Sequence, residues 1–395
     1  MPVPSSWLVQ FCTYGYISAF GVYQDFYTRE FLSNYTASDV SWIGSFQLAM
    51  QYFPAVFVGR AFDAGYFHYT SIAGTILYVF SMMMLSLAQR GHYYQVFLSQ
   101  GVGMGLAQGI LFLPSLTIIS HHFKRRRALA TGIAGTGASA GGIVFPILLN
   151  RLFAGRIGFA NGVRASGGIV GALLVLANLL MCTRMPPKAA RGCSRREFVG
   201  AVVDAPYLAS LAGAFFTTLG LFFPPFYMQL WSIEHGINTQ LAFYTVAILN
   251  AGSVAGRLLP TFLADHLGVY NMIVPAIFAS SVLLWAVFAA KSSAAVIVIS
   301  VLFGFSSGAY TSLIPALLAT LARNVAELGL RMGFAFSVVG VAMLVGTPID
   351  GALLGKNFTW WRPIVFSAVC VLAGSVLMTV SRTMFMRERG GKQMV

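Results

Sequence analysis

The chain has 395 residues, of which 57% are hydrophobic and only 9% are charged. Soluble domains average about 45–50% apolar and about 25% charged residues, so this composition excludes a soluble multi-domain enzyme and indicates a protein that crosses a membrane several times. The formal net charge of +14 does not indicate a nucleic-acid partner, because the cations lie in short gaps between apolar runs, where they reflect membrane topology and contact with anionic lipid.

Twelve apolar stretches are long enough to span a bilayer, which takes about 20 residues of helix. Those of the first half are Trp7–Tyr27, Val40–Val58, Ser71–Ala88, Tyr93–Ser120, Ala128–Leu149 and Gly162–Cys182. Those of the second half are Ala205–Leu230, Leu241–Pro260, Met272–Ala290, Ala294–Leu321, Gly333–Leu354 and Trp361–Ser381. The expected domains are an N-terminal six-helix bundle over residues 1–182, a cytoplasmic linker over 183–204, a C-terminal six-helix bundle over 205–382 and a cytoplasmic tail over 383–395.

The first apolar stretch is not preceded by a basic region, and the first charged residue is Asp25. A cleavable signal peptide is therefore not expected. Because flanking Lys and Arg usually help to orient a first helix, we also expect the start of this chain to be abbreviated.

Four cations in a row, Lys124 to Arg127, fix one loop outside the hydrocarbon, because each costs about 2.5–3.5 kcal/mol at mid-depth. Cytoplasmic loops carry the excess of Lys and Arg, so this loop is expected inside. With the N-terminus inside, 17 of the 25 Lys and Arg residues are cytoplasmic and eight are exterior, which predicts that both termini lie inside. The expected location is the plasma membrane, and a vacuolar or other internal membrane is the alternative.

The two halves of the chain resemble each other, because identical residues recur in the same order at a shift of 201 or 202 positions. The superposed pairs are Gly103 with Gly304, Pro114 with Pro315, Leu129 with Leu330, Gly132 with Gly333, Ala134 with Ala335, Asp63 with Asp265 and Pro146 with Pro348. Such order predicts two parallel six-helix repeats related by an axis along the membrane normal. The expected fold class is an all-α membrane protein with twelve transmembrane helices in two six-helix pseudo-repeats.

The segment from His121 to Gly142 places a basic loop directly before a glycine-rich helix. It resembles the fourth loop and fifth helix of the monocarboxylate-porter family within the major facilitator superfamily. The residues that carry this resemblance are Phe123, Lys124, Arg125, Arg126, Leu129, Ala130, Gly132, Ala134, Gly137 and Gly141. Arg331-Met-Gly333 after an acidic loop resembles the fungal branch of the family, and the resemblance covers nearly the whole chain. It implies the major facilitator fold and transport by alternating access.

A hinge motif of the superfamily appears twice, with Asp63 after the second expected span and Asp265 after the eighth. A carboxylate at this place is able to accept hydrogen bonds from the free N–H groups of a nearby helix start. The resemblance implies that the two aspartates hold the halves together in the outward-open state, whereas the alternative is an ordinary aspartate in a solvated turn. The expected gating residues are Asp63, Asp265, Gly59, Arg125, Arg126 and Arg331.

The eighth expected span carries Arg257, with Ser253 one turn before it. A guanidinium in a half-polar helix seeks an anion, a carbonyl or the membrane interface. Arg257 resembles the arginine that handles the substrate carboxylate in animal porters, where an aspartate stands four residues earlier. Because Ser253 replaces that aspartate, proton coupling of the animal type is not expected. Arg257 either contacts substrate or acts as a snorkelling or gating residue at the cytoplasmic end.

Proline and aromatic residues mark the seventh and tenth expected spans, and a proline frees backbone groups that are tolerated where they line a cavity. For each aromatic side chain the alternative is ordinary packing. The expected substrate-binding residues are Arg257, Asn250, Ser253, Tyr14, Gln108, Phe226, Tyr227 and Tyr310. Asp350, near the outer end of the eleventh span, is an intramembrane carboxylate and hence a functional candidate, unless it lies harmlessly at the interface.

No P-loop, H-E-x-x-H, G-x-S-x-G or Rossmann glycine pattern is placed to support chemistry, so we expect neither an enzyme nor a bound cofactor or metal. The predicted function is secondary transport of a small organic solute, a monocarboxylate or related organic anion, with protons as a candidate coupled ion and the lipid bilayer as surroundings. The alternatives are an exporter of a secondary metabolite on the same fold, and a sensor that keeps the fold without transporting.

Overall fold

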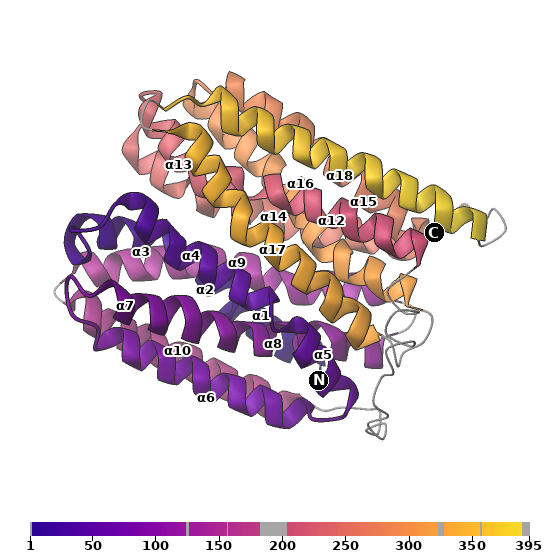
Figure 1. Cartoon of the computed structure of the whole chain (residues 1–395), viewed down its shortest axis with the longest axis horizontal. Coiled ribbons are helices and arrows are strands. Elements are labelled where there is room, and N and C mark those ends of the chain that lie inside the picture. Colours follow the sequence, from indigo (N-terminus) through magenta and orange to yellow (C-terminus); the bar gives the residue numbers. More distant parts are fainter. Residues whose placement is uncertain are drawn as a thin grey trace.

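The computed structural model describes residues 2–123, 126–155, 157–181, 204–322, 328–355 and 358–388, and all regular structure in these ranges is helical. Figure 1 shows two stacked halves, the first in indigo to magenta and the second in pink to yellow. Both termini lie toward the end of the molecule at which α10 ends and α12 begins, which we call the linker end.

The first half starts with a broken helix and continues with longer ones. Its elements are α1 (Pro2–Cys12), α2 (Tyr14–Ile17), α3 (Phe20–Phe26), the π-helical turn η1 (Tyr27–Phe31), α4 (Ala37–Tyr52), α5 (Ala55–Asp63), α6 (Phe67–Ser86), α7 (Tyr93–Val96), the π-helical turns η2 (Phe97–Met104), α8 (Gly105–His122), α9 (Arg127–Ala154) and α10 (Gly158–Leu180). Pro54 separates α4 from α5, because a proline lacks the N–H that would continue the helix.

The second half also begins with a broken helix and continues with longer ones. The broken helix is the seventh span of the chain. Its elements are α12 (Ala205–Leu221), α13 (Phe223–Glu234), α14 (Thr239–Leu267), α15 (Val269–Ala286), the short 3-10 helix η3 (Val287–Ala289), α16 (Ser293–Leu321), α17 (Leu328–Leu354) and α18 (Trp361–Glu388). The break between α12 and α13 precedes Pro224 and Pro225, which occupy the first turn of α13, where no intrahelical donor is needed.

The described residues contain ten helical segments that are long and apolar enough to cross a membrane. The broken helices α1–α3 and α4–α5 occupy the positions of the other two expected spans, so the twelve-helix plan is confirmed. Several helices extend beyond the apolar stretches, because the backbone hydrogen bonds of the helix continue past the apolar residues. α14 therefore continues to Leu267 and α18 to Glu388, and Asp265 lies in the last turn of a helix rather than in a loop.

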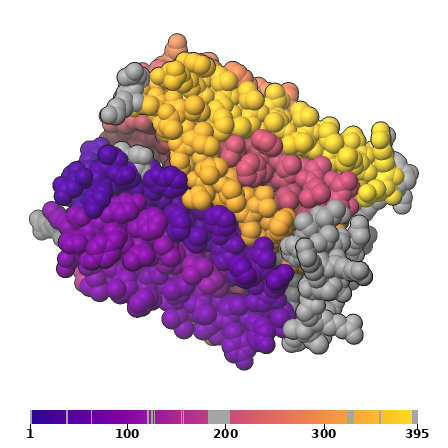
Figure 2. Space-filling model, in the orientation of Figure 1, coloured from indigo at the N-terminus to yellow at the C-terminus, as the bar shows by residue number. Residues whose placement is uncertain are grey.

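Glycines bring the two halves into backbone contact. A Cβ on Gly132 of α9 would collide with the carbonyl of Arg257 on α14, and a Cβ on Gly333 of α17 would lie 2.5 Å from the carbonyl of Ala55 on α5. Small residues at such places let helices approach closely within a membrane. The halves consequently meet where α9 packs on α14 and α16 and where α17 packs on α4 and α5. Figure 2 shows α17, in orange, lying against indigo helices of the first half.

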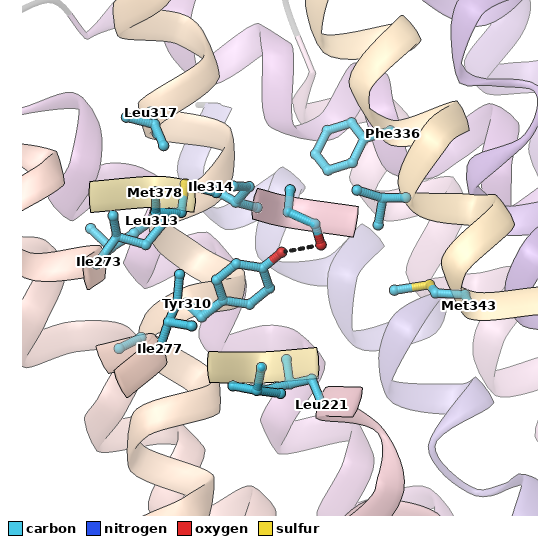
Figure 3. Close-up of a cluster of buried hydrophobic side chains, with 14 of the residues drawn as sticks. Leu221, Ile273, Ile277, Tyr310, Leu313, Ile314, Leu317, Phe336, Met343 and Met378 are labelled. Carbon is cyan, nitrogen blue, oxygen red and sulfur yellow. Dashed lines mark hydrogen bonds between the residues drawn. The ribbon is translucent and has the colours of Figure 1, made fainter. Parts of the chain in front are cut away.

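The second half has its own apolar core. Figure 3 shows Tyr310 of α16 surrounded by side chains that include Ile273, Ile277, Leu313 and Ile314. The Tyr310 hydroxyl lies 3.1 Å from that of Thr218, so its polar tip is satisfied within the core. Tyr310 thus belongs to the interior of this half.

Candidate functional site

A cavity of about 130 Å³ lies between the two halves. Its walls come from α2, α3 and α4 on one side and from α12, α13, α14 and α16 on the other. Aromatic and aliphatic side chains make up much of the lining, and the polar members are mostly hydroxyls and amides. Among the described lining residues Arg257 is the single charged one, which makes it the electrostatic focus of the cavity.

Arg257 is held by hydroxyl and aromatic groups rather than by an acid. Its Nε donates to Ser253 Oγ at 3.2 Å, and its Cζ lies 5.9 Å from the centroid of the Tyr14 ring. Ser139 of α9 donates to the same Ser253 oxygen at 3.1 Å, so this contact also joins the two halves. The side chain is only 7% exposed, and no carboxylate of the described ranges forms an ion pair with it. A buried cation without an acid is prepared to receive an anion.

A second, smaller cavity of about 30 Å³ lies on the far side of Arg257. It shares Tyr14, Arg257 and Thr311 with the main cavity, so these three residues form the wall between the two spaces. Gln24 and Gln229 line the main cavity and belong to α3 and α13, which lie toward the end of the molecule opposite the linker end. The two spaces follow one another along the axis between the halves.

An aromatic cluster borders the smaller cavity. Tyr52 of α4, Phe112 of α8 and Phe336 of α17 have ring centroids 5.2–5.8 Å apart and come from both halves. The sequence pattern did not distinguish these rings from ordinary packing. Tyr52 and Phe112 line the smaller cavity, and both rings contact Phe336 of the other half.

Asp265 fastens the two halves at the linker end. Its two carboxylate oxygens accept hydrogen bonds from the backbone N–H groups of Ala128 and Leu129, each at 3.0 Å. These donors belong to the first turn of α9, where N–H groups lack intrahelical partners and the helix dipole favours a negative charge. A carboxylate of α14 therefore caps a helix of the other half.

The described contacts of three other expected gating residues do not indicate a gating role. Gly59 is buried in α5, and Arg126 is exposed at the start of α9. The side chain of Asp63 and all of Arg125 lie outside the described residues.

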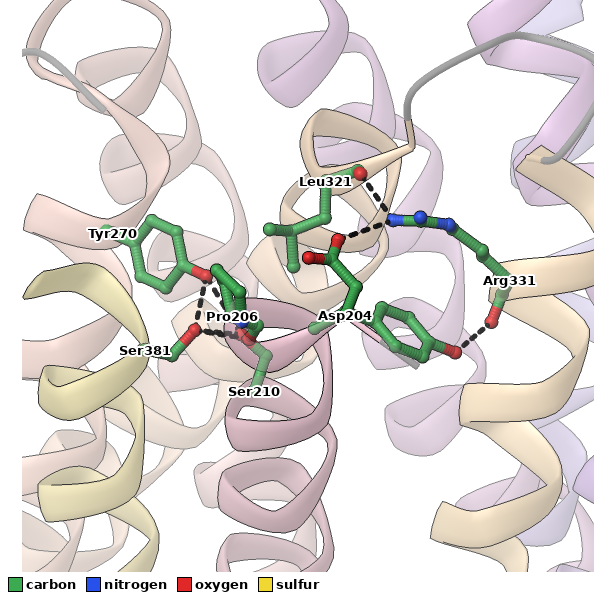
Figure 4. A network of polar contacts seen from close by, with 8 residues as sticks. Asp204, Pro206, Ser210, Tyr270, Leu321, Arg331 and Ser381 are labelled. Carbon is green, nitrogen blue, oxygen red and sulfur yellow. Dashed lines mark hydrogen bonds and ion pairs between the residues drawn. The ribbon is translucent and has the colours of Figure 1, made fainter. Parts of the chain in front are cut away.

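Arg331 ties together three helix ends within the second half (Figure 4). Its Nη1 donates to the carbonyl of Leu321 at 2.6 Å and lies 3.3 Å from Asp204 Oδ2. The guanidinium packs over the Tyr207 ring at 5.3 Å, and the Tyr207 hydroxyl donates to the Arg331 carbonyl at 2.8 Å. Nearby, the hydroxyls of Ser210, Tyr270 and Ser381 bond one another. The contacts of Arg331 shown here join α12, α16 and α17, all of one half.

The structure brings five expected substrate-binding residues together at the main cavity and places three elsewhere. Those at the cavity are Arg257, Ser253, Asn250, Tyr14 and Phe226. Gln108 is fully buried inside the first half, where it donates to the Tyr78 hydroxyl at 2.8 Å and accepts from Gln47. Tyr227 donates to the carbonyl of Thr347 at 3.0 Å, on the other side of α13. Tyr310 belongs to the core described above.

Several lining residues are not among the expected substrate-binding residues. They are Gln24, Gln229, Ser307 and Thr311, together with Phe222 at the break of the seventh span. Gln229 stands three residues after Phe226, so helical spacing from an expected lining residue would have found it. Ser307 and Thr311 stand four residues apart on one face of α16, but no expected lining residue of that helix pointed to them.

The fold and the site together define a membrane transporter with a cavity between two six-helix halves. The sequence model of the Major Facilitator Superfamily matches residues 6–288. The chain belongs to the major facilitator superfamily, and it is a multi-pass membrane transporter rather than an enzyme. The monocarboxylate-porter branch within that superfamily stays a prediction.

Curated relatives include several efflux proteins. The aspyridones efflux protein of Emericella nidulans is 39% identical over 369 residues, which cover 93% of this chain and 74% of that protein. The fujikurins efflux protein of Gibberella fujikuroi is 34% identical, with 98% and 83% covered. The agnestins efflux protein of Paecilomyces divaricatus is 36% identical, with 95% and 86% covered.

Solved structures of low sequence identity share the fold. The fucose:proton symporter of E. coli superposes with a TM-score of 0.70 at 14% identity, covering 96% of this chain and 98% of that one. The human organic anion transporter MFSD10 superposes with a TM-score of 0.70 at 12% identity, covering 96% of each chain. At such identities the likeness establishes the fold alone.

Proposed function

We propose that this chain exports a small amphipathic secondary metabolite that carries one negative charge. The observation that carries the proposal is Arg257, a single cation at the base of an otherwise uncharged, largely apolar cavity. Its planar guanidinium is suited to hold a carboxylate or a delocalised oxyanion through two parallel hydrogen bonds. The efflux proteins among its relatives support export as the direction.

The walls of the cavity support an amphipathic solute rather than a purely polar one. Phe20, Phe222 and Phe226 offer aromatic faces, and Asn250 and Gln229 offer amides. Ligand sites of this kind combine apolar burial with a few polar groups that fix orientation. An apolar body would rest on the rings while the anionic group reaches Arg257.

The second candidate is a porter for a small monocarboxylate. It is favoured by the two terminal nitrogens of Arg257, which make no hydrogen bond within the described part of the chain. A small carboxylate would use the same arginine but would leave the aromatic walls largely uncovered. The two functions therefore predict different solute preferences at one site.

The test is a transport assay with purified protein in liposomes of known orientation. The solute panel contains aspyridones, fujikurins and agnestins, with lactate and pyruvate as small carboxylates. We expect at least one metabolite to move toward the side opposite the linker end, and Arg257→Gln to lower its rate at least tenfold. Transport of lactate or pyruvate alone would establish the second candidate, and transport of nothing in the panel would contradict both.

The matched control removes a cation that does not line the cavity. Arg164 of α10 donates to Ser86 within the first half. Arg164→Gln should therefore leave solute transport unchanged at equal protein abundance. Equal losses in the two variants would show that Arg257 acts through folding rather than through the solute.

A further inference from the structure

The smaller cavity is bounded on one side by Gly135 of α9, where the missing side chain leaves space. A Cβ on Gly135 would lie 3.0 Å from Ser312 Oγ and 3.1 Å from Arg257 Nη1. All three residues line this cavity, and they belong to α9, α16 and α14. A hydroxyl and a guanidinium nitrogen of the second half therefore converge on one small space beside a helix of the first half.

The Ser312 hydroxyl is a buried donor that the protein does not use. The side chain is 2% exposed, and its Oγ forms no hydrogen bond within the part of the chain that the structure describes. The adjacent hydroxyl on the same helix is satisfied, since Thr311 Oγ1 donates to the carbonyl of Gly308 at 3.1 Å. An unpaired buried hydroxyl is costly, so its position at a cavity wall indicates an acceptor from outside the chain.

The charge around the cavity is positive and uncompensated. Neither cavity has an Asp or Glu among its described lining residues. On α14 the carboxylate nearest to Arg257 in sequence is Asp265, about two turns later, and both of its oxygens accept hydrogen bonds from α9. The helices α9 and α16 contain no Asp or Glu. The acceptor that suits this cavity therefore carries a negative charge.

The volume of the cavity limits the acceptor to a small ion. The cavity measures about 30 Å³, whereas a single bound water needs about 10–15 Å³. It consequently has space for one monatomic anion but not for an organic solute, which would need the main cavity of about 130 Å³. A divalent anion such as sulfate is disfavoured, because a single buried cation would leave one of its charges uncompensated.

We propose that the smaller cavity is a chloride site, in which Arg257 Nη1 and the Ser312 hydroxyl hold the ion beside Gly135. Both groups donate hydrogen bonds, and chloride accepts them while it neutralises the guanidinium. A water molecule would satisfy the hydroxyl but would leave the charge uncompensated. The proposal goes beyond export, because it assigns to the protein a second ligand on the side of Arg257 away from the main cavity.

Chloride and an anionic solute share one cation in this arrangement. Arg257 belongs to the wall between the two cavities, so its single positive charge is compensated from either side but not fully from both. Chloride in the smaller cavity therefore weakens the binding of an anion in the main cavity and leaves a neutral solute unaffected. A carrier without solute exists in a neutral, chloride-bound form and a positive, chloride-free form, and the chloride concentration sets their ratio.

The first test measures chloride binding in the absence of any transported solute. Purified protein in lipid nanodiscs and sodium gluconate is titrated with sodium chloride at constant ionic strength, and the linewidth of the chloride magnetic resonance signal is recorded. We expect a saturable broadening that bromide removes and extra gluconate does not. Ser312→Ala should weaken the apparent chloride affinity at least fivefold, because the ion loses one of its two donors. Gly135→Ala should do the same, because the added methyl group fills the space.

Ser300→Ala is the matched control for this titration. Ser300 lies on the same helix, and its Oγ is also buried and unpartnered within the described ranges, but it lines neither cavity. Its replacement should leave chloride binding unchanged. Equal midpoints of thermal unfolding in gluconate for the wild type and Ser312→Ala would show that a lost affinity is not a lost fold. A wild type without saturable broadening, or broadening that Ser312→Ala leaves unchanged, would overturn the proposal.

The second test concerns the competition between the two anions, and it rests on the proposed function. In liposomes, replacement of gluconate by chloride on both sides of the membrane should raise the apparent Michaelis constant for an anionic solute at least threefold. Ser312→Ala should remove most of this rise, and Ser300→Ala should retain it. An equal rise in the wild type and Ser312→Ala would contradict competition at Arg257. If no anionic solute is transported, the export proposal fails, whereas the chloride site is decided by the binding titration alone.

Discussion

Arg257 owes its position to a serine where a porter of the animal type would have an acid. The Ser253 hydroxyl orients Nε without neutralising the guanidinium, and Tyr14 covers one face of the group. A hydroxyl costs little to bury when it is itself hydrogen-bonded, whereas an aspartate at this place would compete with any anionic solute. The residue at position 253, one helical turn before Arg257, thus decides whether the guanidinium is available to an anionic solute.

Ser253→Asp tests this availability directly. A carboxylate four residues before Arg257 on the same helix face should form an ion pair with it. We expect the apparent Michaelis constant for an anionic solute to rise about tenfold or more, with little change for a neutral solute. Ser253→Asn, which is similar in size but uncharged, is the control. A similar rise for both variants would point to a loss of shape rather than to charge.

Tyr310→Phe tests the assignment of this tyrosine to the core. Its hydroxyl contacts Thr218 and the carbonyl of Ala214, and both partners lie in α12. Removing the hydroxyl should cost about 0.5–1.5 kcal/mol of stability, measured as a lower midpoint of thermal unfolding in detergent. The apparent Michaelis constant should stay the same, and a change in it would return Tyr310 to the list of solute contacts.

At the scale of helices, the order of the spans followed from composition alone, but their ends and breaks did not. The length of the apolar stretch predicted where α14 lies. The helix nevertheless continues through Asp265, because hydrogen bonding along the backbone does not require apolar side chains. Pro224 and Pro225 marked the seventh span in the sequence without locating a break, and the structure shows that the helix breaks there, with α13 beginning at Phe223. The sequence could not show that Tyr227 and Phe226, adjacent on that helix, point to different neighbours.

Asp265→Asn tests the cap that α14 provides for α9. The amide keeps one acceptor but loses the charge, so the interaction with the helix start should weaken by about 0.3–1 kcal/mol. We expect faster hydrogen–deuterium exchange at residues 128–131 and a slower solute transport rate at matched abundance. Asp39→Asn, which alters the exposed first turn of α4 at the other end of the molecule, should leave α9 unchanged. Unaltered exchange in Asp265→Asn would reduce this aspartate to a surface residue.

At the scale of the whole molecule, the repeat predicted the two halves and the residues at which they would be equivalent. The equivalent residues Gly132 and Gly333 did both lie where an added Cβ would meet the backbone of the other half. What the repeat could not predict is which side chains of the two halves would meet, because that depends on the relative tilt of the halves. The ring cluster of Tyr52, Phe112 and Phe336 is assembled from three distant segments and has no local pattern.

Gly132→Ala tests the packing between the halves. The added methyl group would meet the Arg257 carbonyl and the Thr261 hydroxyl, and neither is the free end of a flexible chain. We expect the halves to separate at the linker end, seen as faster hydrogen–deuterium exchange in the first two turns of α9, and transport to slow several-fold. Gly168→Ala on α10 is the control, since nothing lies within 4 Å of its added methyl group. Equal behaviour of the two variants would argue against a tight seam.

We expect the lone charge of Arg257 to make the carrier sensitive to voltage. An elementary charge that crosses 100 mV gains or loses about 2.3 kcal/mol. With a monovalent anion bound, the site is neutral and reorients without regard to the field, but the empty site carries one positive charge. If the linker end faces the cytoplasm, as the Lys and Arg distribution predicts, a negative interior draws the empty carrier back to the side where solute is loaded. The resting potential would then drive the return stroke of export, and clamping liposomes to zero potential should slow the net efflux of an anionic metabolite, an effect that Arg257→Gln should not show.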